Sequence, residues 1–234
     1  LVAIPIIDHE NCLVGIVTVD DAMLVMQEET TEDISMMAGV SPNEDSYFGT
    51  SVFQHAKNRS LWLMLLMLSA TVSGEILAHY EKAMAAMPVL ITFIPMLMGT
   101  SGNSGSQSST MVIRGLAVGE IQFKDFFRVV FKEIRVALIV GVLLAIVNGV
   151  RVYLMYDQDL TLAIAIGITV IGGHTGAGMI AIVCMAKCVG CTLPLLAKKI
   201  GLDPALMAAP LISTIMDTCT ILMYFAIITA LYRM

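Results

Sequence analysis

The chain has 234 residues, of which 57% are hydrophobic and only 14% charged, and its mean hydropathy is +0.84. Soluble domains carry roughly a quarter of their residues as charges, so this composition excludes an ordinary water-exposed globule and indicates a membrane protein. The formal net charge of −6 argues against a nucleic-acid partner, because a phosphate backbone requires clustered Lys and Arg.

The first forty residues predict two strands and a helix. Leu1–Ile7 and Leu13–Val19 are β-branched apolar runs separated by a polar turn, which is typical of a strand pair. Asp20 and Asp21 precede an apolar helical stretch, and an Asp in that position is a favourable N-cap. These elements make half of a small α/β module, which cannot bury its own core. We therefore expect its partner upstream or on another chain.

Acidic residues are concentrated in this N-terminal region. Ten of the 19 acids precede residue 46, namely Asp8, Glu10, Asp20, Asp21, Glu28, Glu29, Glu32, Asp33, Glu44 and Asp45. The first basic residue is Lys57, and the chain is almost continuously apolar from Leu61 onward. Self-repulsion opposes folding and dimerisation of such a region unless cations screen it, so the region is a candidate sensor of divalent cations.

Five stretches are long and apolar enough to cross a hydrocarbon core of ~30 Å. The predicted spans are Leu61–Ala78, Ala83–Met111, Val136–Tyr156, Leu160–Cys184 and Leu206–Tyr232. The second contains Pro88, Pro95 and the run Gly99–Gly105, so we predict a broken helix that is buried in protein or lines a wet cavity. Phe123–Arg135 alternates basic and apolar residues and predicts an amphipathic helix at the membrane surface.

Basic residues predict the orientation in the membrane. With the N-terminal region inside, one side carries Lys57, Arg59, Arg114, Lys124, Arg128, Lys132, Arg135, Lys187, Lys198 and Lys199. The other side carries only Lys82, Arg151 and Arg233. We therefore predict a cytoplasmic N-terminus and an extracytoplasmic C-terminus.

Asp217 is an acid inside the last predicted span, without a Lys or Arg nearby. A carboxylate at membrane depth costs at least ~2.5 kcal/mol on insertion scales, so it marks an ion or proton path by default. A protonated or hydrogen-bonded structural Asp is the alternative. Helical spacing puts Leu206, then Ala209 or Pro210, Ser213 and Thr220 on the same face, which is mostly small and polar.

The second span has a matching face, on which Gly99, Gly102, Ser106 and Thr110 recur at intervals of three and four. Carbonyl, hydroxyl and carboxylate oxygens suit a hard cation such as Mg²⁺, which keeps much of its water. Two such faces together predict a pore with one anionic site. Close helix packing also produces small-residue stripes in membranes, so packing is the alternative for this stripe alone.

Two weaker patterns remain. Ser101 lies in a G-x-S-G sequence and, with His174, resembles the serine–histidine pair of rhomboid-like intramembrane proteases. That hypothesis leaves Asp217 and the acidic region unexplained. Cys184, Cys188 and Cys191 have an arguable metal-site spacing without an evident fourth ligand, so we favour packing.

Together these residues resemble the MgtE family of magnesium transporters and channels. The matching stretches are Gly99–Thr110, Ile113–Ala117, and Gly201–Ala205 running on to Pro210 and Asp217. Residues 15–21 and 29–34 resemble the end of that family's second CBS domain and the start of its connecting helix. The resemblance implies the C-terminal part of a longer protein: a CBS fragment over 1–33, a connecting helix over 34–60 and a five-helix pore domain over 61–234.

The resemblance further implies an all-α membrane fold and a homodimer in the bilayer, with the ion path at the dimer axis. By position, Asp217 is the pore aspartate, and the pore-lining face comprises Gly99, Gly102, Ser106, Thr110, Leu206, Ala209 and Ser213. The cytoplasmic Mg²⁺ sensor maps onto Asp21, Glu29, Glu32, Asp33 and Asp203. Some members carry Asn in place of Ser106 and Ala209, and one carries an acid in place of Leu24.

We therefore predict a Mg²⁺-selective, Mg²⁺-gated channel of a bacterial inner membrane, and not an enzyme. Mg²⁺ is both the transported ion, held hydrated at Asp217, and the regulatory ligand. High cytoplasmic Mg²⁺ bridges the acidic region and holds the connecting helix closed, whereas repulsion opens it at low Mg²⁺. The alternative is a secondary transporter that exchanges Na⁺ or H⁺ for a divalent cation, for which a broken helix is also typical.

Overall fold

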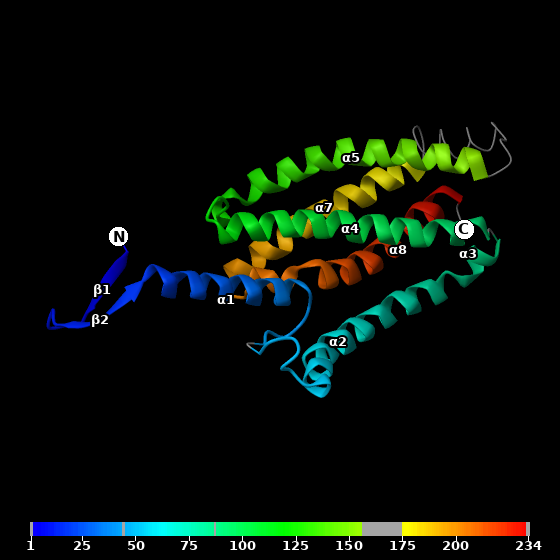
Figure 1. The fold of residues 1–234 in the computed structure, drawn as a ribbon. Coiled ribbons are helices and arrows are strands. Elements are labelled where there is room, and N and C mark those ends of the chain that lie inside the picture. The colour runs from blue at the N-terminus through cyan, green and yellow to red at the C-terminus, as the bar shows by residue number, and fades with distance from the viewer. Residues whose placement is uncertain (1, 44, 87, 156–174, 233–234) are drawn as a thin grey trace.

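The computed structural model describes residues 2–43, 45–86, 88–155 and 175–232. A two-stranded hairpin and one helix precede a bundle of long helices (Figure 1). In the hairpin, β1 (Ala3–Ile7) pairs antiparallel with β2 (Leu13–Thr18), and α1 (Val19–Met37) follows directly. The predicted order of strand, strand and helix is confirmed.

A capping box closes the first turn of α1. The Thr18 hydroxyl accepts the Asp21 amide hydrogen, and the Asp21 carboxylate accepts the Thr18 amide at 2.9 Å and the Thr18 hydroxyl at 2.6 Å. The prediction of an Asp N-cap is wrong, because Thr18 is the cap and Asp21 is the residue that reaches back to it. The side-chain and backbone hydrogen bonds from Thr18 lower the pKa of the Asp21 carboxyl below its ordinary value.

The hairpin and α1 bury little of their apolar surface. Ile4 and Ile16 are 58% and 61% exposed, and α1 has no buried residue. Two strands and one helix supply no second layer to cover this surface, and the covering partner upstream or on another chain stays a prediction.

Residues 34–60 do not form the single connecting helix that the resemblance implies. Instead, α1 ends at Met37, and α2 (Val52–His79) begins after Ser51, its N-cap. Gly39 ends the first helix with a φ of +70°, a conformation that glycine adopts readily. A β-carbon on Gly39 would also collide with the Trp62 ring, so the loop lies close against α2.

The membrane region continues with the short α3 (Glu81–Ala86), then α4 (Val89–Ala117), α5 (Phe126–Met155), α7 (Thr175–Lys199) and α8 (Ala209–Tyr232). Among the described residues, three helical stretches are long and apolar enough to cross a membrane: Val52–His79, Gly178–Lys199 and Ala209–Thr229. Most of the predicted fourth span, Leu160–Cys184, lies outside the described residues. The count of five spans therefore stays a prediction.

The glycine-rich run does not break the second predicted span. A single helix, α4, runs from Val89 to Ala117 and contains both Pro95 and Gly99–Gly105. The interruption comes earlier, where α3 ends and Pro88 precedes α4. Within this run, Gly102 lies close to α8 and Gly105 lies close to both α7 and α8, so these two glycines serve helix contact and not a break.

Two further boundaries differ from the sequence prediction. Phe123–Arg135 is not a separate surface helix, because the 3₁₀ turn η1 (Phe123–Asp125) leads directly into the 30 residues of α5. The last span does not begin at Leu206, which lies in a second 3₁₀ turn, η2 (Pro204–Met207), before α8. Proline at the first position of η2 and the Asp203 cap set this turn apart from the helix.

Helix α4 is central to the bundle. It packs against α7 and α8, while α5 packs on α7 and α2 on α8. The end of α4, the start of α5, the end of α7 and η2 lie at the end of the bundle nearest α1 (Figure 1). Several of the basic residues predicted to share one side of the membrane thus occupy one end of the bundle, including Arg114, Lys124, Lys198 and Lys199.

Candidate functional site

Small residues bring α4 and α8 into close contact. A β-carbon on Gly102 would lie 3.3 Å from the Ser213 hydroxyl oxygen, and the Ser106 hydroxyl lies 3.5 Å from the same oxygen. The Ser106 hydroxyl also donates to the Ala209 carbonyl at 3.4 Å. Four of the predicted pore-lining residues therefore meet along one helix contact. Leu206 is half-buried in η2, outside this helical face.

Asp217 lies one turn beyond Ser213 on α8 and is half-buried. Its sequence neighbours anchor the helix on two sides. The Thr218 hydroxyl lies 2.7 Å from the Ser73 hydroxyl of α2, and the Thr220 hydroxyl donates to Ser101 of α4 at 2.7 Å. Helical geometry leaves Asp217 on the side of α8 between α2 and α4.

The Asp217 carboxylate stands alone in this part of the bundle. It is the only acid in either α4 or α8. No residue that the structure describes forms a hydrogen bond or an ion pair with it. A charge in a membrane helix without a structural partner is typical of an ion or proton path.

The open face of α4 is polar. Gly99, Asn103, Gln107 and Thr110 are exposed on a helix of the membrane region. Such groups avoid lipid and face water or protein, since hydrocarbon satisfies none of their hydrogen bonds. Sequence reasoning missed Asn103 and Gln107, although their spacing of four from Gly99 was the available signal. Their amides add oxygen acceptors to this face.

The opposite face of α4 is buried. Ser101, Ser104, Ser108 and Ser109 are at most 5% exposed. The Ser109 hydroxyl donates to the Met207 carbonyl, and the Ser101 hydroxyl donates to the Met98 carbonyl at 2.9 Å while it accepts from Thr220. These bonds give Ser101 a packing role. His174, its partner in the protease hypothesis, lies outside the described residues.

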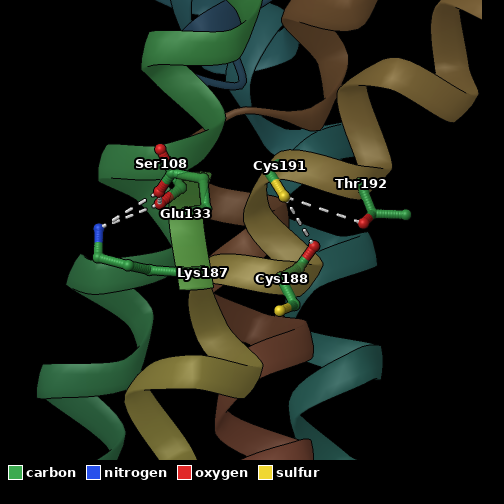
Figure 2. A network of polar contacts seen from close by, with 6 residues as sticks. All are labelled: Ser108, Glu133, Lys187, Cys188, Cys191 and Thr192. Atoms are coloured by element: carbon green, nitrogen blue, oxygen red, sulfur yellow. Dashed lines mark hydrogen bonds and ion pairs between the residues drawn. The ribbon is translucent and has the colours of Figure 1, made fainter. Parts of the chain in front are cut away.

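An ion pair lies inside the bundle where α4, α5 and α7 meet (Figure 2). The Lys187 ammonium is 3.6 Å from the Glu133 carboxylate, and their side chains are 5% and 15% exposed. Ser108 joins the two charges, since its hydroxyl donates to Glu133 at 2.6 Å and accepts from Lys187 at 3.2 Å. Buried charges are tolerated when paired and hydrogen-bonded in this way.

Sequence reasoning missed this network and counted Lys187 among the basic residues at the membrane surface. The available signal was the same as for Asp217, namely a charge inside an apolar run. The network links three helices, since Ser108, Glu133 and Lys187 come from α4, α5 and α7. Its two charges neutralise each other, so it has no net charge that would attract an ion.

The cysteines near this network make local contacts (Figure 2). The Cys191 thiol donates to the Cys188 carbonyl at 3.3 Å and lies 4.0 Å from the Thr192 hydroxyl. Cys184 is half-buried on the same helix, and all three thiols are free. Within the described ranges, no group of three His, Cys, Asp or Glu side chains is arranged to hold a metal ion.

Of the five predicted sensor residues, Asp203 lies at η2, and the other four lie toward the two ends of α1. Asp21 lies at its start, about 18 Å along the helix from Asp33, and Glu29 and Glu32 are exposed near its end. Burial raises the pKa of the Asp33 carboxyl above its ordinary value, and the negative charges of Asp203 and Glu29 raise it further. Asp203 caps η2 by accepting the Ala205 amide at 2.8 Å. Since α1 packs against η2, the contact between them is acidic, with Asp33 and Glu29 on the α1 side and Asp203 on the η2 side.

This fold and site define a polytopic helical membrane protein whose bundle holds a half-buried carboxylate without a partner among the described residues. A family model described as MgtE, a divalent cation transporter, matches residues 94–227, which is more than half of the chain. The chain belongs to the MgtE family, as its motifs predict.

Three curated relatives carry the name magnesium transporter MgtE. The protein of Thermus thermophilus is 35% identical over 96% of this chain and 47% of its own length. The proteins of Bacillus subtilis and Enterococcus faecalis are 32% and 30% identical, over 97% and 99% of this chain and 48% of their own lengths. The chain spans about half the length of these relatives.

Proposed function

We propose that the chain forms the ion-conducting part of a Mg²⁺-selective channel in a bacterial inner membrane. Asp217 carries the proposal, because it is a half-buried carboxylate in a membrane helix without a partner among the described residues. The relatives named magnesium transporters supply the identity of the ion. Transport needs no covalent chemistry, so no enzymatic step is proposed.

Asp217 holds Mg²⁺ mainly through the water shell of the ion. Mg²⁺ gives up water reluctantly and commonly binds proteins through only one or two carboxylates. The fixed negative charge attracts divalent cations, and the exposed amides and hydroxyls of α4 accept hydrogen bonds from the hydrated ion. Asn103, Ser106 and Gln107 thereby favour an octahedral hydrate of one size. Ions pass inward down their electrochemical gradient without ATP.

A homodimer encloses this path. In one chain, the polar face of α4 is exposed and the Asp217 side of α8 is half-buried, and polar surface facing lipid is costly. When two copies meet through these faces, each shields the polar surface of the other from lipid. Two Asp217 carboxylates then lie on one ion path. The N-terminus is cytoplasmic and the C-terminus extracytoplasmic, as the distribution of basic residues predicts.

Cytoplasmic Mg²⁺ closes the channel by bridging the acidic contact between α1 and η2. Asp33, Glu29 and Asp203 repel one another when no cation is present, and Glu32 and Asp21 add to the negative field of α1. Carboxylates and water suit Mg²⁺ at such a contact. Bound Mg²⁺ docks α1 on η2, directly before the pore helix α8, whereas low Mg²⁺ releases it.

Entry of Mg²⁺ into proteoliposomes loaded with a Mg²⁺-sensitive dye tests the channel. We expect entry driven by an imposed membrane potential alone, its loss in Asp217→Ala, and its retention in the control Glu120→Ala, which removes an exposed acid. Equal entry in Asp217→Ala and the unmodified chain would contradict the pore assignment. Entry that requires an opposing Na⁺ or H⁺ gradient would favour the secondary transporter instead.

A further inference from the structure

The outward face of α5 changes character along the helix. From η1 through the first turns of α5, its exposed side chains are basic or aromatic, namely Lys124, Phe127, Arg128, Phe131, Lys132 and Arg135. Further along, they are aliphatic, with Ile139 73% and Leu143 59% exposed, and Val147 and Leu154 continue the series. Spacings of three and four residues place both groups along one side of the helix.

The four cations of this face have no acidic partner among the described residues. The ion pair found there joins Lys187 to Glu133, and Glu133 turns inward to Ser108. Arg135 instead lies 5.0 Å from the centre of the Phe131 ring, and Lys199 of α7 lies 4.6 Å from that of Phe123. A surface of unpaired cations beside aromatic rings is complementary to an anion.

We propose that this α5 basic face (Lys124, Arg128, Lys132 and Arg135, with Phe127 and Phe131) binds the headgroup of an anionic phospholipid. Guanidinium and ammonium groups pair with phosphate oxygens, and aromatic rings favour the level of the headgroups. The aliphatic turns that follow, beginning at Ile139, run beside the acyl chains. Basic clusters on amphipathic helices at a membrane are a known signature of anionic lipid recognition.

The face combines a basic part with an aliphatic part, and this combination favours a lipid over other ligands. An acidic peptide or a free phosphate would pair with the cations but would leave the exposed aliphatic turns of α5 uncovered. A second copy of the chain would cover the aliphatic turns, yet the same basic surface on both copies would repel at a symmetric contact. A lipid satisfies both parts, because its charge and its chains follow one another along the helix.

Native mass spectrometry of the whole chain in neutral detergent tests the proposal with phosphatidylglycerol and with phosphatidylcholine of the same acyl chains. Arg128→Gln/Lys132→Gln removes two cations of the face, and the matched control Lys57→Gln/Arg59→Gln removes two exposed cations of α2. Each Lys or Arg near an anionic surface contributes about fivefold in affinity, so we expect the first variant to bind phosphatidylglycerol about 25-fold more weakly. Phosphatidylcholine binding should be equal in all three proteins.

Equal binding of the two lipids to the unmodified chain, or equal phosphatidylglycerol affinity in both double variants, would overturn the proposal. Retention of inorganic phosphate alone would assign the face to a free anion, and weaker self-association of Arg128→Gln/Lys132→Gln with unchanged lipid binding would assign it to a second copy. Arg128→Lys/Lys132→Arg keeps both charges and should keep lipid binding. Thermal unfolding in lipid-free detergent shows whether every variant is folded.

Discussion

The two faces of α4 carry similar small and polar residues but meet different surroundings. On one face, Ser101, Ser108 and Ser109 are buried and hydrogen-bonded to neighbouring elements. On the other face, Asn103 and Gln107 are exposed, and the adjacent helix α8 contributes a carboxylate for which the described ranges supply no partner. A stripe of Gly, Ser and Thr is therefore not by itself an ion path, because the neighbouring helices decide whether it packs or stays open.

Charges inside the bundle show the same contrast. Lys187 and Glu133 neutralise each other and share Ser108, whereas Asp217 has no described partner. The Lys187–Glu133 pair lies against the buried face of α4, whereas Asp217 lies beside the exposed face of α4. Variants of the buried face should therefore change stability, and variants of the open face should change ion flux.

Removal of one member of the buried pair should have the largest effect. Lys187→Met leaves Glu133 buried without a counter-charge, which typically costs 3–5 kcal/mol, so we expect the free energy of unfolding in detergent to fall by about 4 kcal/mol. In the double variant Lys187→Met/Glu133→Leu, both charges are gone and stability should return close to that of the unmodified chain. If Lys187→Met were as stable as the unmodified chain, the ion pair would have no role in stability.

Two alanine substitutions in α4 compare its faces directly. A β-carbon at Gly105 would lie 2.8 Å from the Ile212 side chain and 3.2 Å from the Ala186 carbonyl, whereas at Gly99 it would meet nothing within 4 Å. Overpacking costs about 1–3 kcal/mol, so Gly105→Ala should destabilise the bundle by that amount. Gly99→Ala should leave stability unchanged or raise it by up to about 1 kcal/mol, through helix propensity. Chemical unfolding in detergent measures both, and equal losses would erase the distinction between the faces.

Flux should separate Gln107, which is exposed, from Ser104, which is buried one turn earlier on α4. Gln107→Leu removes an exposed amide from the proposed path, so Mg²⁺ entry into proteoliposomes should fall while stability is kept. The Ser104 hydroxyl is buried without a hydrogen-bond partner among the described residues, so Ser104→Ala should change neither property for the worse. Unchanged entry in Gln107→Leu would take the open face out of the ion path.

The smallest effect is expected at the acidic contact between α1 and η2. The pKa of the Asp33 carboxyl is raised in the folded chain, so its favourable contribution to docking is complete below the ordinary value of 3.8 and is lost as the pH rises through the raised value. At neutral pH, Asp33→Asn should therefore slow hydrogen exchange in residues 30–37, as Mg²⁺ should in the unmodified chain. The control Glu28→Gln should not change exchange in this segment.

Hydrogen exchange at a pH below that ordinary value sharpens this test. The unmodified chain and Asp33→Asn should then exchange alike, because the Asp33 carboxyl is protonated in both the docked and the released state. A difference between the variants that persists at low pH would show that charge repulsion is not what loosens the contact.

The sequence by itself determined the membrane class, the strand–strand–helix start, the MgtE family and the isolated position of Asp217. These features depend on composition, local periodicity and motifs, all of which can be read along a single segment. The same local patterns misplaced several boundaries. Gly99–Gly105 was expected to break a helix, because the pattern does not include the helices that pack against it. Asp21 was expected to be a cap, although Thr18 three residues earlier completes a local capping box.

Tertiary structure alone decided which polar groups are paired. Lys187 and Glu133 lie on helices distant in sequence, and only their packing beside α4 brings them to Ser108. The same packing buries Ser101 and exposes Asn103, which lie two positions apart on one helix. A buried polar group must find its partner wherever the fold supplies one, and that partner belongs to another segment of the chain.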